Sequence, residues 1–351
     1  MNMTSEDKVG SAPKSGRETF TLMAIACLLI SNSHLEGLYP RSWMAADGLL
    51  GNSIFFLLAG LGVTMSQSRR PYGLIRFYSR RILRIYPSLI FVVLVGWALG
   101  LTPRVNDASE VIQELTWPTG YGFVMLVMLL YPAGWAMARA SERVGAWIAT
   151  GCLLAWLGTV TLVARGIPPG ETVLLGHLPK YMWHAFYALV FISGGYFGLC
   201  KSKVKIAVMP WLITVGVAGI LYVVLKFAYY KTGGFESVSV AVVAGGLQGL
   251  VLLMATGLLN LIPTMNATLG AIGLERPLAW LGRSSLQVYL SHMWFARSLS
   301  HWDMAWPVKV SVFFLLALTT AVLIRWLIDY VVKYLTGKSH DKKRQQLNTI
   351  S

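Results

Sequence analysis

The sequence predicts an all-α polytopic membrane protein, built as a bundle of about ten transmembrane helices with both termini in the cytoplasm. Two observations predict this class. The 351 residues are 55% hydrophobic and only 13% charged, with a mean hydropathy of +0.58, whereas soluble domains carry roughly 25% charged residues. Apolar stretches long enough to cross a bilayer also recur along the whole chain.

The expected spans are separated by short polar or basic segments. The first is expected to be a retained span, because no small-residue cleavage site follows its apolar core. A polar break from Arg139 to Arg143 divides the long apolar run that follows the third span. The spans cover residues 18–36, 49–66, 86–102, 117–138, 145–164, 181–200, 206–227, 237–261, 277–297 and 308–332.

Basic residues decide the expected orientation. Lys and Arg gather in the segments on the side of the two termini, including 69–84 and the tail after Lys338. Because cytoplasmic loops carry the excess of positive charge, both termini are expected in the cytoplasm. No loop is long enough for a second folded domain. The sequence therefore predicts one membrane domain over 1–338 and a polar cytoplasmic tail over 339–351.

A cationic helix is expected before the third span. Residues 69–87 read RRPYGLIRFYSRRILRIYP and pass directly into the apolar SLIFVVLVGWALG. No Asp or Glu occurs over 48–106 to neutralise this charge. Spacings of three and four residues place several arginines on neighbouring positions of one helical surface. These are Arg76, Arg80, Arg81 and Arg84.

Two functions fit these arginines. Guanidinium groups bind phosphate bidentately, so the set predicts a polyphosphate site at the cytoplasmic face. Arg81 and Arg84, nearest the bilayer, favour this function most, because a charge held there is costly without a partner. Topology signalling and contact with lipid headgroups are the alternative, and they suffice for Arg69 and Arg70.

His34 is a candidate general base. It closes the polar run Ser31 to His34 after the apolar part of the first span, and imidazole titrates near neutral pH. A histidine that caps the span at the membrane interface explains the position equally well. Glu36 can orient His34 only if the chain has left the helix at Gly37, because side chains two residues apart diverge on a helix.

A polar stripe marks the ninth span. Ser285, Tyr289 and His292 are four and three residues apart and so share a helical face. Gly282 would let another helix approach closely. Within a membrane such a stripe must face the bundle interior. Substrate binding or an oxyanion donor from Ser285 or Tyr289 fits this pattern, and so does hydrogen bonding between helices.

Other chemistries find little support. Cys27, Cys152 and Cys200 are scattered and suggest neither a disulfide framework nor a metal site. The remaining histidines show no metal-binding spacing, so no metal is expected, and no nucleic-acid motif occurs. Arg325 and Asp329, four residues apart, are expected to form a structural ion pair.

Four segments together resemble the acyltransferase-3 family of membrane-bound O-acyltransferases: the histidine-terminated first span, GNSIFFLLAGLGVTMS, FYSRRILRIYP and LAWLGRSSLQVYLSH. The resemblance covers the whole chain in order. It implies that His34 matches the family's essential histidine and that Arg81 and Arg84 match its paired cytoplasmic arginines. The residues that match its late-helix motif are Gly282, Ser285, Tyr289 and His292.

Two positions depart from the family pattern. Met23 stands where the family usually carries an arginine upstream of the histidine. The stretch GFVMLVMLLYP lacks a glutamate that is common in some branches. Both departures concern the expected catalytic arrangement.

The resemblance implies transfer of an acyl group, most often acetyl from acetyl-CoA, to a hydroxyl of a cell-surface carbohydrate such as an exopolysaccharide, or of its lipid-linked precursor. It implies a bacterial cytoplasmic membrane, with lipids, acyl-CoA and a glycan acceptor as partners and no nucleic acid. The arginines would hold the CoA phosphates, and His34 would take the acceptor proton. A transporter or flippase of lipid-linked glycans or small organic anions is the alternative class, although the sequence shows no inverted repeat.

Overall fold

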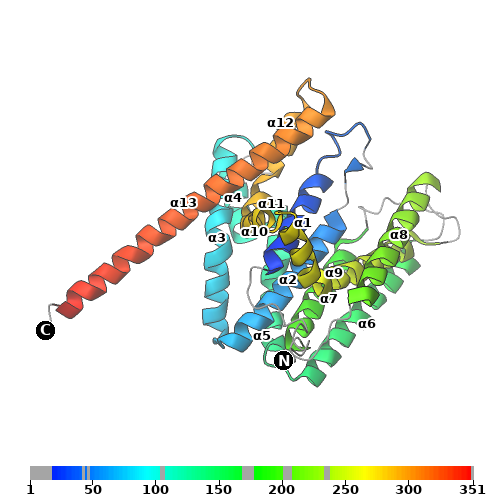
Figure 1. Ribbon diagram of the computed structural model, residues 1–351, viewed down its shortest axis with the longest axis horizontal. Coiled ribbons are helices and arrows are strands. Elements are labelled where there is room, and N and C mark those ends of the chain that lie inside the picture. The colour runs from blue at the N-terminus through cyan, green and yellow to red at the C-terminus, as the bar shows by residue number, and fades with distance from the viewer. Residues whose placement is uncertain are drawn as a thin grey trace, which may run out of the picture. The chain divides into compact units, whose positions relative to one another are not determined.

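The computed structural model describes residues 18–41, 44–45, 48–102, 107–167, 178–200, 208–232 and 238–348. Every regular element in these ranges is a helix, which confirms the all-α prediction (Figure 1). In chain order they are α1 (Glu18–Ser33), α2 (Gly48–Arg69), α3 (Leu74–Ala98), α4 (Ala108–Thr116), the 3₁₀ turn η2 (Thr119–Tyr121), α5 (Gly122–Met137), α6 (Glu142–Gly166), α7 (Lys180–Cys200), α8 (Val208–Thr232), α9 (Val240–Ala271), α10 (Glu275–Arg283), α11 (Ser285–Ser291), α12 (Met293–Ser300) and α13 (Trp306–Asn348).

Seven helices in the described ranges are long and apolar enough to cross a membrane: α2, α3, α6, α7, α8, α9 and α13. This makes the chain an integral membrane protein. The first and fourth expected spans correspond to the shorter apolar helices α1 and α5. The ninth does not form one continuous helix, and that expectation was wrong: residues 275–300 form α10, α11 and α12, with breaks at Ser284 and His292.

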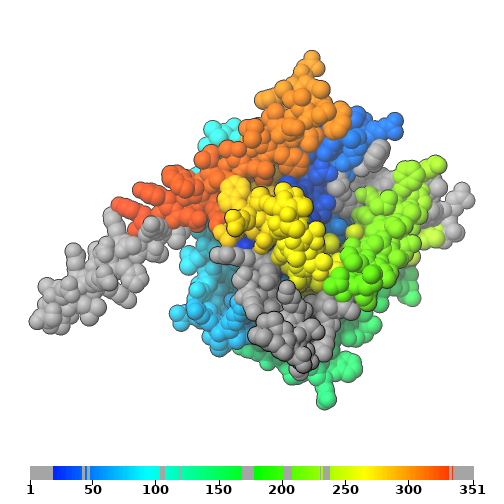
Figure 2. Space-filling view, viewed as in Figure 1, coloured from blue at the N-terminus to red at the C-terminus, as the bar shows by residue number. Residues whose placement is uncertain are grey.

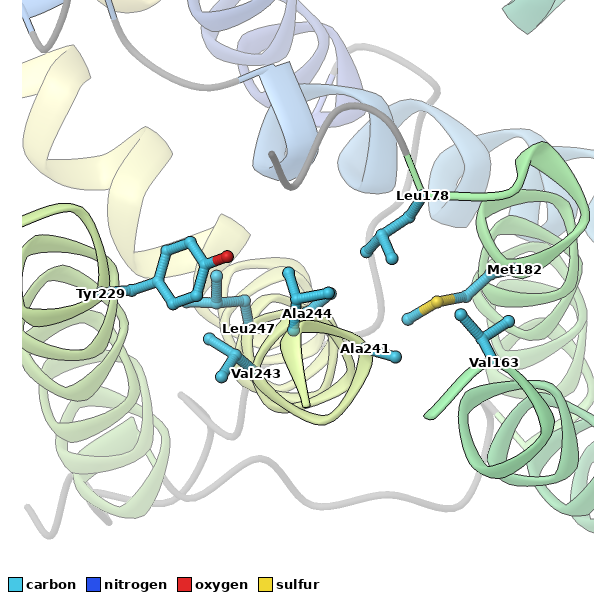
Figure 3. Packing of buried hydrophobic residues seen from close by; sticks show 9 residues of the cluster. Val163, Leu178, Met182, Tyr229, Ala241, Val243, Ala244 and Leu247 are labelled. Carbon is cyan, nitrogen blue, oxygen red and sulfur yellow. The ribbon is translucent and has the colours of Figure 1, made fainter. Parts of the chain in front are cut away.

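The chain divides into two compact units. The first comprises Met1–Ile30, Asp47–Tyr78 and Phe123–Gly282, and it contains α2 and α5 to α10. Within it α2 packs along α7, α6 lies against both α7 and α9, and α8 packs on α9. Figure 3 shows one of its apolar clusters, in which Met182 of α7 and Val163 of α6 lie near Ala241 and Ala244 of α9, with Tyr229 of α8 on the other side of α9.

Glycines allow α2 and α7 to approach within backbone contact. A side chain added at Gly60 would collide with the carbonyl oxygen of Phe191, and one added at Gly194 would collide with that of Leu57. Small residues at a membrane helix interface let the two backbones approach closely. The resulting van der Waals contacts hold the helices together, because lipid supplies no hydrophobic force to drive their association. Since α2 is also the most buried of the seven long apolar helices, this contact lies in the interior of the first unit.

The turn before α3 is fixed to the end of α5. The carbonyl oxygen of Tyr72 accepts hydrogen bonds from the indole of Trp135 at 2.9 Å and from the guanidinium of Arg139 at 2.6 Å. The guanidinium also stacks 3.7 Å from the centre of the Trp135 ring. Arg139, expected only as a polar break between spans, therefore sets where the cationic helix begins.

The second unit comprises Ser31–Ala46, Ser79–Gly122 and Arg283–Ser351. In its core Leu35 and Leu38, from the turn after α1, pack with Ala296 and Leu299 of α12 and with Phe313 of α13. The backbone of α13 stays helical through the polar segment up to Asn348.

Sequence patterns alone did not reveal α4, which lies in an expected outer loop. Asp107 caps it by accepting a hydrogen bond from the Glu110 amide at 2.9 Å. This bond, with a second from the Ser109 hydroxyl, lowers the pKa of Asp107 below its usual value. The cap residue and the acidic first turn are the signals that could have predicted this helix.

Candidate functional site

His34 lies where α1 ends. The helix stops at Ser33, and the His34 amide donates to the carbonyl of Ser31 at 3.3 Å in the turn that follows. The helix therefore ends within the polar run, three residues before the end of the expected span at residue 36. The hydroxyl of Tyr39 donates to the Asn32 side chain at 2.6 Å, which holds the turn against the helix end. The imidazole of His34 is exposed.

The structure brings His34 together with His292. Their ring centres are 5.1 Å apart and the rings are tilted by 40°. Sequence reasoning named both residues but not their pairing, because they are far apart in sequence and no spacing rule links them. His292 lies between α11 and α12 and is only 2% exposed. One ring of the pair is therefore open and the other is buried.

The hydrogen bonds of His292 define its open nitrogen. Its Nδ1 lies 2.7 Å from the carbonyl oxygen of Tyr289 and 3.2 Å from that of Val288. A carbonyl can only accept, so Nδ1 carries the hydrogen and, in the neutral ring, Nε2 carries the lone pair. Nε2 is buried, and no partner for it lies within the described chain. The pair thus contains one buried, unused proton acceptor.

Tyr289, like His292 a member of the polar stripe, lies beside the histidine pair. The Tyr289 ring lies 6.0 Å from the ring of His292, and Ser285 is buried one turn earlier on α11. The shared face expected of these three residues is compatible with the structure, although α11 ends at Ser291. Gly282 also approaches α1 as expected: an added side chain would collide with the carbonyl oxygen of Phe20.

Glu36 stands on the turn rather than on the helix. The chain has left α1 three residues before Glu36, earlier than Gly37, and the Glu36 carboxylate is exposed. The geometric condition for an orienting role is therefore met. The role itself stays a prediction.

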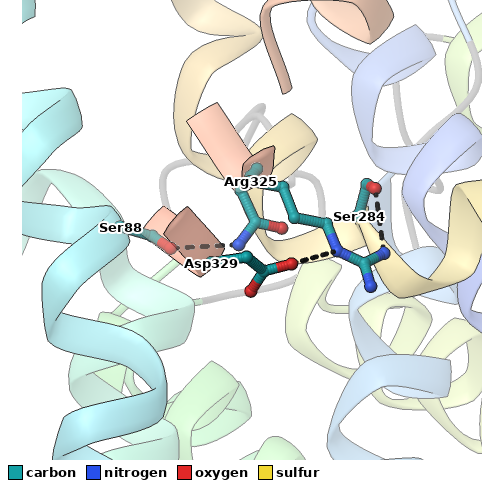
Figure 4. A network of polar contacts seen from close by, with 5 residues as sticks. Ser88, Ser284, Arg325 and Asp329 are labelled. Atoms are coloured by element: carbon teal, nitrogen blue, oxygen red, sulfur yellow. Dashed lines mark hydrogen bonds and ion pairs between the residues drawn. The ribbon is translucent and has the colours of Figure 1, made fainter. Parts of the chain in front are cut away.

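Two polar contacts fix α11 to its neighbours (Figure 4). The Gln287 amide donates to the hydroxyl of Ser88 on α3 at 3.0 Å. Arg325 of α13 donates to the hydroxyl of Ser284 at 3.3 Å and pairs with Asp329 at 3.6 Å, which confirms the expected ion pair. These contacts hold the N-terminal half of the short helix that precedes His292.

The arginines lie on the first half of α3, as predicted. Arg76, Arg80 and Arg84 are exposed and Arg81 is half-buried. The Arg76 guanidinium lies 5.0 Å from the centre of the Tyr72 ring. Helix α3 continues through Pro87 into the apolar half, so Ser88 lies one turn beyond Arg84. The bond from Ser88 to Gln287 links the arginine-bearing helix to α11 within the second unit.

Sequence reasoning missed a buried carboxylate on α4. Glu114 is 6% exposed, and its two oxygens accept from the Gly120 amide at 2.8 and 3.0 Å. The stretch GFVMLVMLLYP lacks a glutamate, but this one lies a few residues upstream. An acidic residue on an amphipathic helix that leads into an apolar span was the available signal.

Searches of curated proteins and of solved structures gave no significant match. A family model described as an acyltransferase domain matches residues 22–329, which include both histidines, the four arginines of α3 and all of α11. Because this match covers most of its length, the chain belongs to the acyltransferase-3 family.

Proposed function

We propose that the protein transfers an acyl group, acetyl above all, from acyl-CoA to a hydroxyl of a cell-surface carbohydrate or its lipid-linked precursor in the bacterial cytoplasmic membrane. The observation that carries this proposal is the pairing of exposed His34 with buried His292 in a chain of the acyltransferase-3 family. An acyl transfer to a hydroxyl needs a proton acceptor that substrate can reach. His34 meets this need.

His34 acts as the general base. It accepts the proton of the acceptor hydroxyl while the hydroxyl oxygen attacks the thioester carbonyl carbon. The carbon–sulfur bond then breaks, CoA leaves as its thiolate, and the proton passes from His34 to that sulfur. The products are the ester and free CoA. The Tyr289 or Ser285 hydroxyl would donate to the oxyanion as it forms.

His292 supports the base from behind. Because its Nδ1 hydrogen is committed to the Tyr289 carbonyl, its Nε2 can accept a hydrogen bond from the His34 ring. Such a bond would orient His34 and stabilise it when it holds the proton. Glu36, on the same turn, would add a negative charge near the protonated ring.

Arg80, Arg81 and Arg84, with Arg76 one turn earlier, would hold the CoA phosphates. Their forks suit phosphate oxygens. The link between Ser88 and Gln287 keeps the end of this arginine row close to α11, in the same unit as both histidines. The thioester arm would then reach from the phosphates toward the pair.

The test measures the rate at which purified protein in lipid nanodiscs releases free CoA thiol from acetyl-CoA. His34→Ala should lower the rate by roughly 10²- to 10⁴-fold, the usual contribution of a general base. His34→Gln should not restore it, because an amide cannot take a proton near neutral pH. Wild-type turnover should also fall at acidic pH, because protonated His34 cannot accept the hydroxyl proton.

His184→Gln is the matched control, since it removes an imidazole from α7 in the other unit. It should leave thiol release unchanged. Near-wild-type turnover in His34→Gln would remove His34 from the mechanism. Movement of a lipid-linked glycan across the membrane without any thiol release would instead favour the transporter alternative.

A further inference from the structure

We propose that the second unit holds an anion site at the end of α12, and that this site binds a carboxylate or phosphate group of an anionic acceptor. This rests on the proposed function and adds the charge class of the acceptor to it. The site is a cavity of about 190 Å³. Its lining residues are Gly100, Leu101, Arg297, Ser298 and His301.

The lining is basic. Arg297 and His301 are four residues apart at the end of α12, both are exposed, and none of the lining residues is acidic. The other groups are already committed: the Ser298 hydroxyl donates to the Trp294 carbonyl, and the amides of Gly100 and Leu101 close the end of α3. The side-chain donors that remain are therefore those of Arg297 and His301, which favour an anion.

The wall of the cavity is built from two packed segments. Gly100, at φ 64°, ends α3 in the left-handed conformation that glycine adopts readily. Below it, a side chain added at Gly96 would lie 2.7 Å from both Trp294 Nε1 and Thr102 Cγ2. Trp294 Nε1 and Thr102 Oγ1 are buried without a hydrogen-bond partner in the described chain. The end of α3 is therefore packed closely against α12.

The cavity and the histidine pair lie at opposite ends of α12. His292 immediately precedes the helix, and His301 immediately follows it. The turn after α1 runs along the same helix: His34 reaches His292, and a side chain added at Gly37 would lie 3.8 Å from Ser300 Cβ. By the helical rise, the cavity lies about 8 to 14 Å from His292. A short glycan could place a hydroxyl at His34 and its anionic group in the cavity.

The cavity also lies far from the proposed donor site. Gly100 follows Arg84 by 16 residues, or about 24 Å along α3. Donor phosphates and acceptor anion would therefore occupy opposite ends of one helix. Cations at the end of α12 also interact favourably with its dipole, so the experiment must detect ligand binding and not only the stability of the helix.

The probes are digalacturonate and its neutral methyl ester, a matched pair that differs in charge. Binding is measured by equilibrium dialysis with protein in phosphatidylcholine nanodiscs and with CoA at saturation, so that the α3 arginines are occupied. Wild type should bind digalacturonate more tightly than the ester. Arg297→Gln should weaken digalacturonate binding about tenfold, the effect of one charge-assisted hydrogen bond, and should leave ester binding unchanged.

Arg297→Lys should restore part of the affinity, since it keeps the charge but not the fork. Arg41→Gln, which removes another exposed arginine of the same unit outside the cavity, is the control and should bind as wild type. Equal affinity of wild type for the two probes, or unchanged binding in Arg297→Gln, would overturn the proposal.

Two further measurements distinguish failure of the anion site from failure of the proposed function. In phosphatidylglycerol nanodiscs, loss of the wild-type preference for digalacturonate would assign the cavity to a lipid headgroup and overturn the acceptor assignment. Thiol release from acetyl-CoA is measured on the same preparations. If wild type releases no thiol, the proposed function fails; if it releases thiol without any preference for digalacturonate, only the anion site fails.

Discussion

The two histidines meet because each stands where a helix ends. His34 follows Ser33 at the end of α1, and His292 occupies the break between α11 and α12. The ring of His292 is held by the helix that precedes it: Nδ1 donates to the Tyr289 carbonyl in α11, and Nε2 has no partner in the described chain.

Substitutions of His292 can separate its two nitrogens. His292→Asn keeps a donor near the position of Nδ1 but removes the Nε2 acceptor, so it should fold and lose about 10- to 100-fold in thiol release. His292→Gln places an amide near Nε2 and should recover part of that loss. Thermal unfolding of both variants in nanodiscs provides the control. A His292→Asn variant as active as wild type would restrict His292 to a packing role.

At the scale of the element, α3 joins a cationic half to an apolar half without a break. The charged half is mostly exposed, with Arg81 partly sheltered, and the apolar half is attached to α11 through Ser88. The sequence predicted this helix well, because the arginine spacing and the apolar run share one continuous register. It could not predict the attachment, which depends on Gln287 far along the chain.

Arg81→Ala and Arg84→Ala should each weaken acyl-CoA binding by about 10- to 100-fold, since one charge-assisted phosphate contact contributes about 1.5–3 kcal/mol. Lysine at either position should rescue only in part, because it lacks the planar fork. Affinity for CoA is measured by isothermal titration, with expression and membrane insertion as controls. Unchanged affinity in both alanine variants would leave topology signalling as the explanation of these arginines.

The contact between α2 and α7 predicts a stability effect. Gly194→Ala should lower the free energy of unfolding by about 1–3 kcal/mol, because the added methyl group meets the Leu57 carbonyl and the two helices must separate. Gly62→Ala is the matched control on α2: its added methyl meets open space, and alanine favours the helix by up to about 1 kcal/mol. Unfolding in mixed micelles measures both. Equal stability of the two variants would contradict the tight interface.

At the scale of the whole molecule, the lengths of the apolar runs predicted where helices form but not where a helix is interrupted. Seven of the described helices are long and apolar enough to cross a membrane, and each coincides with an expected span, because apolar runs flanked by charge are strong signals. The ninth is broken at Ser284, whose hydroxyl accepts from Arg325 of α13, and at His292, whose ring contacts carbonyl oxygens of the preceding turn. The contact with Arg325 involves a partner that the local sequence does not specify. For the same reason the candidate residues could be named in advance, but the pairing of His34 with His292 could not.

The orientation of the chain is a separate prediction. Reporter fusions truncated within 107–117 and at Ser351 should lie on opposite sides of the membrane, with Ser351 in the cytoplasm, because the basic segments favour that side. Alkaline phosphatase and green fluorescent protein activities distinguish the two sides. Both fusions on one side would contradict the predicted topology.

The helices of the first unit differ sharply in how much of their surface is enclosed. In their most apolar stretches, 67% of the residues of α2 are buried but only 6% of those of α8, and Figure 2 shows α8 standing at the surface. The consequence is an uneven freedom to evolve. Most positions of α8 need only remain apolar, so leucine, valine and phenylalanine are interchangeable there, whereas at the buried positions of α2 a substitution must be matched by a change in a neighbouring helix. Sequence drift should therefore accumulate faster on α8 than on α2.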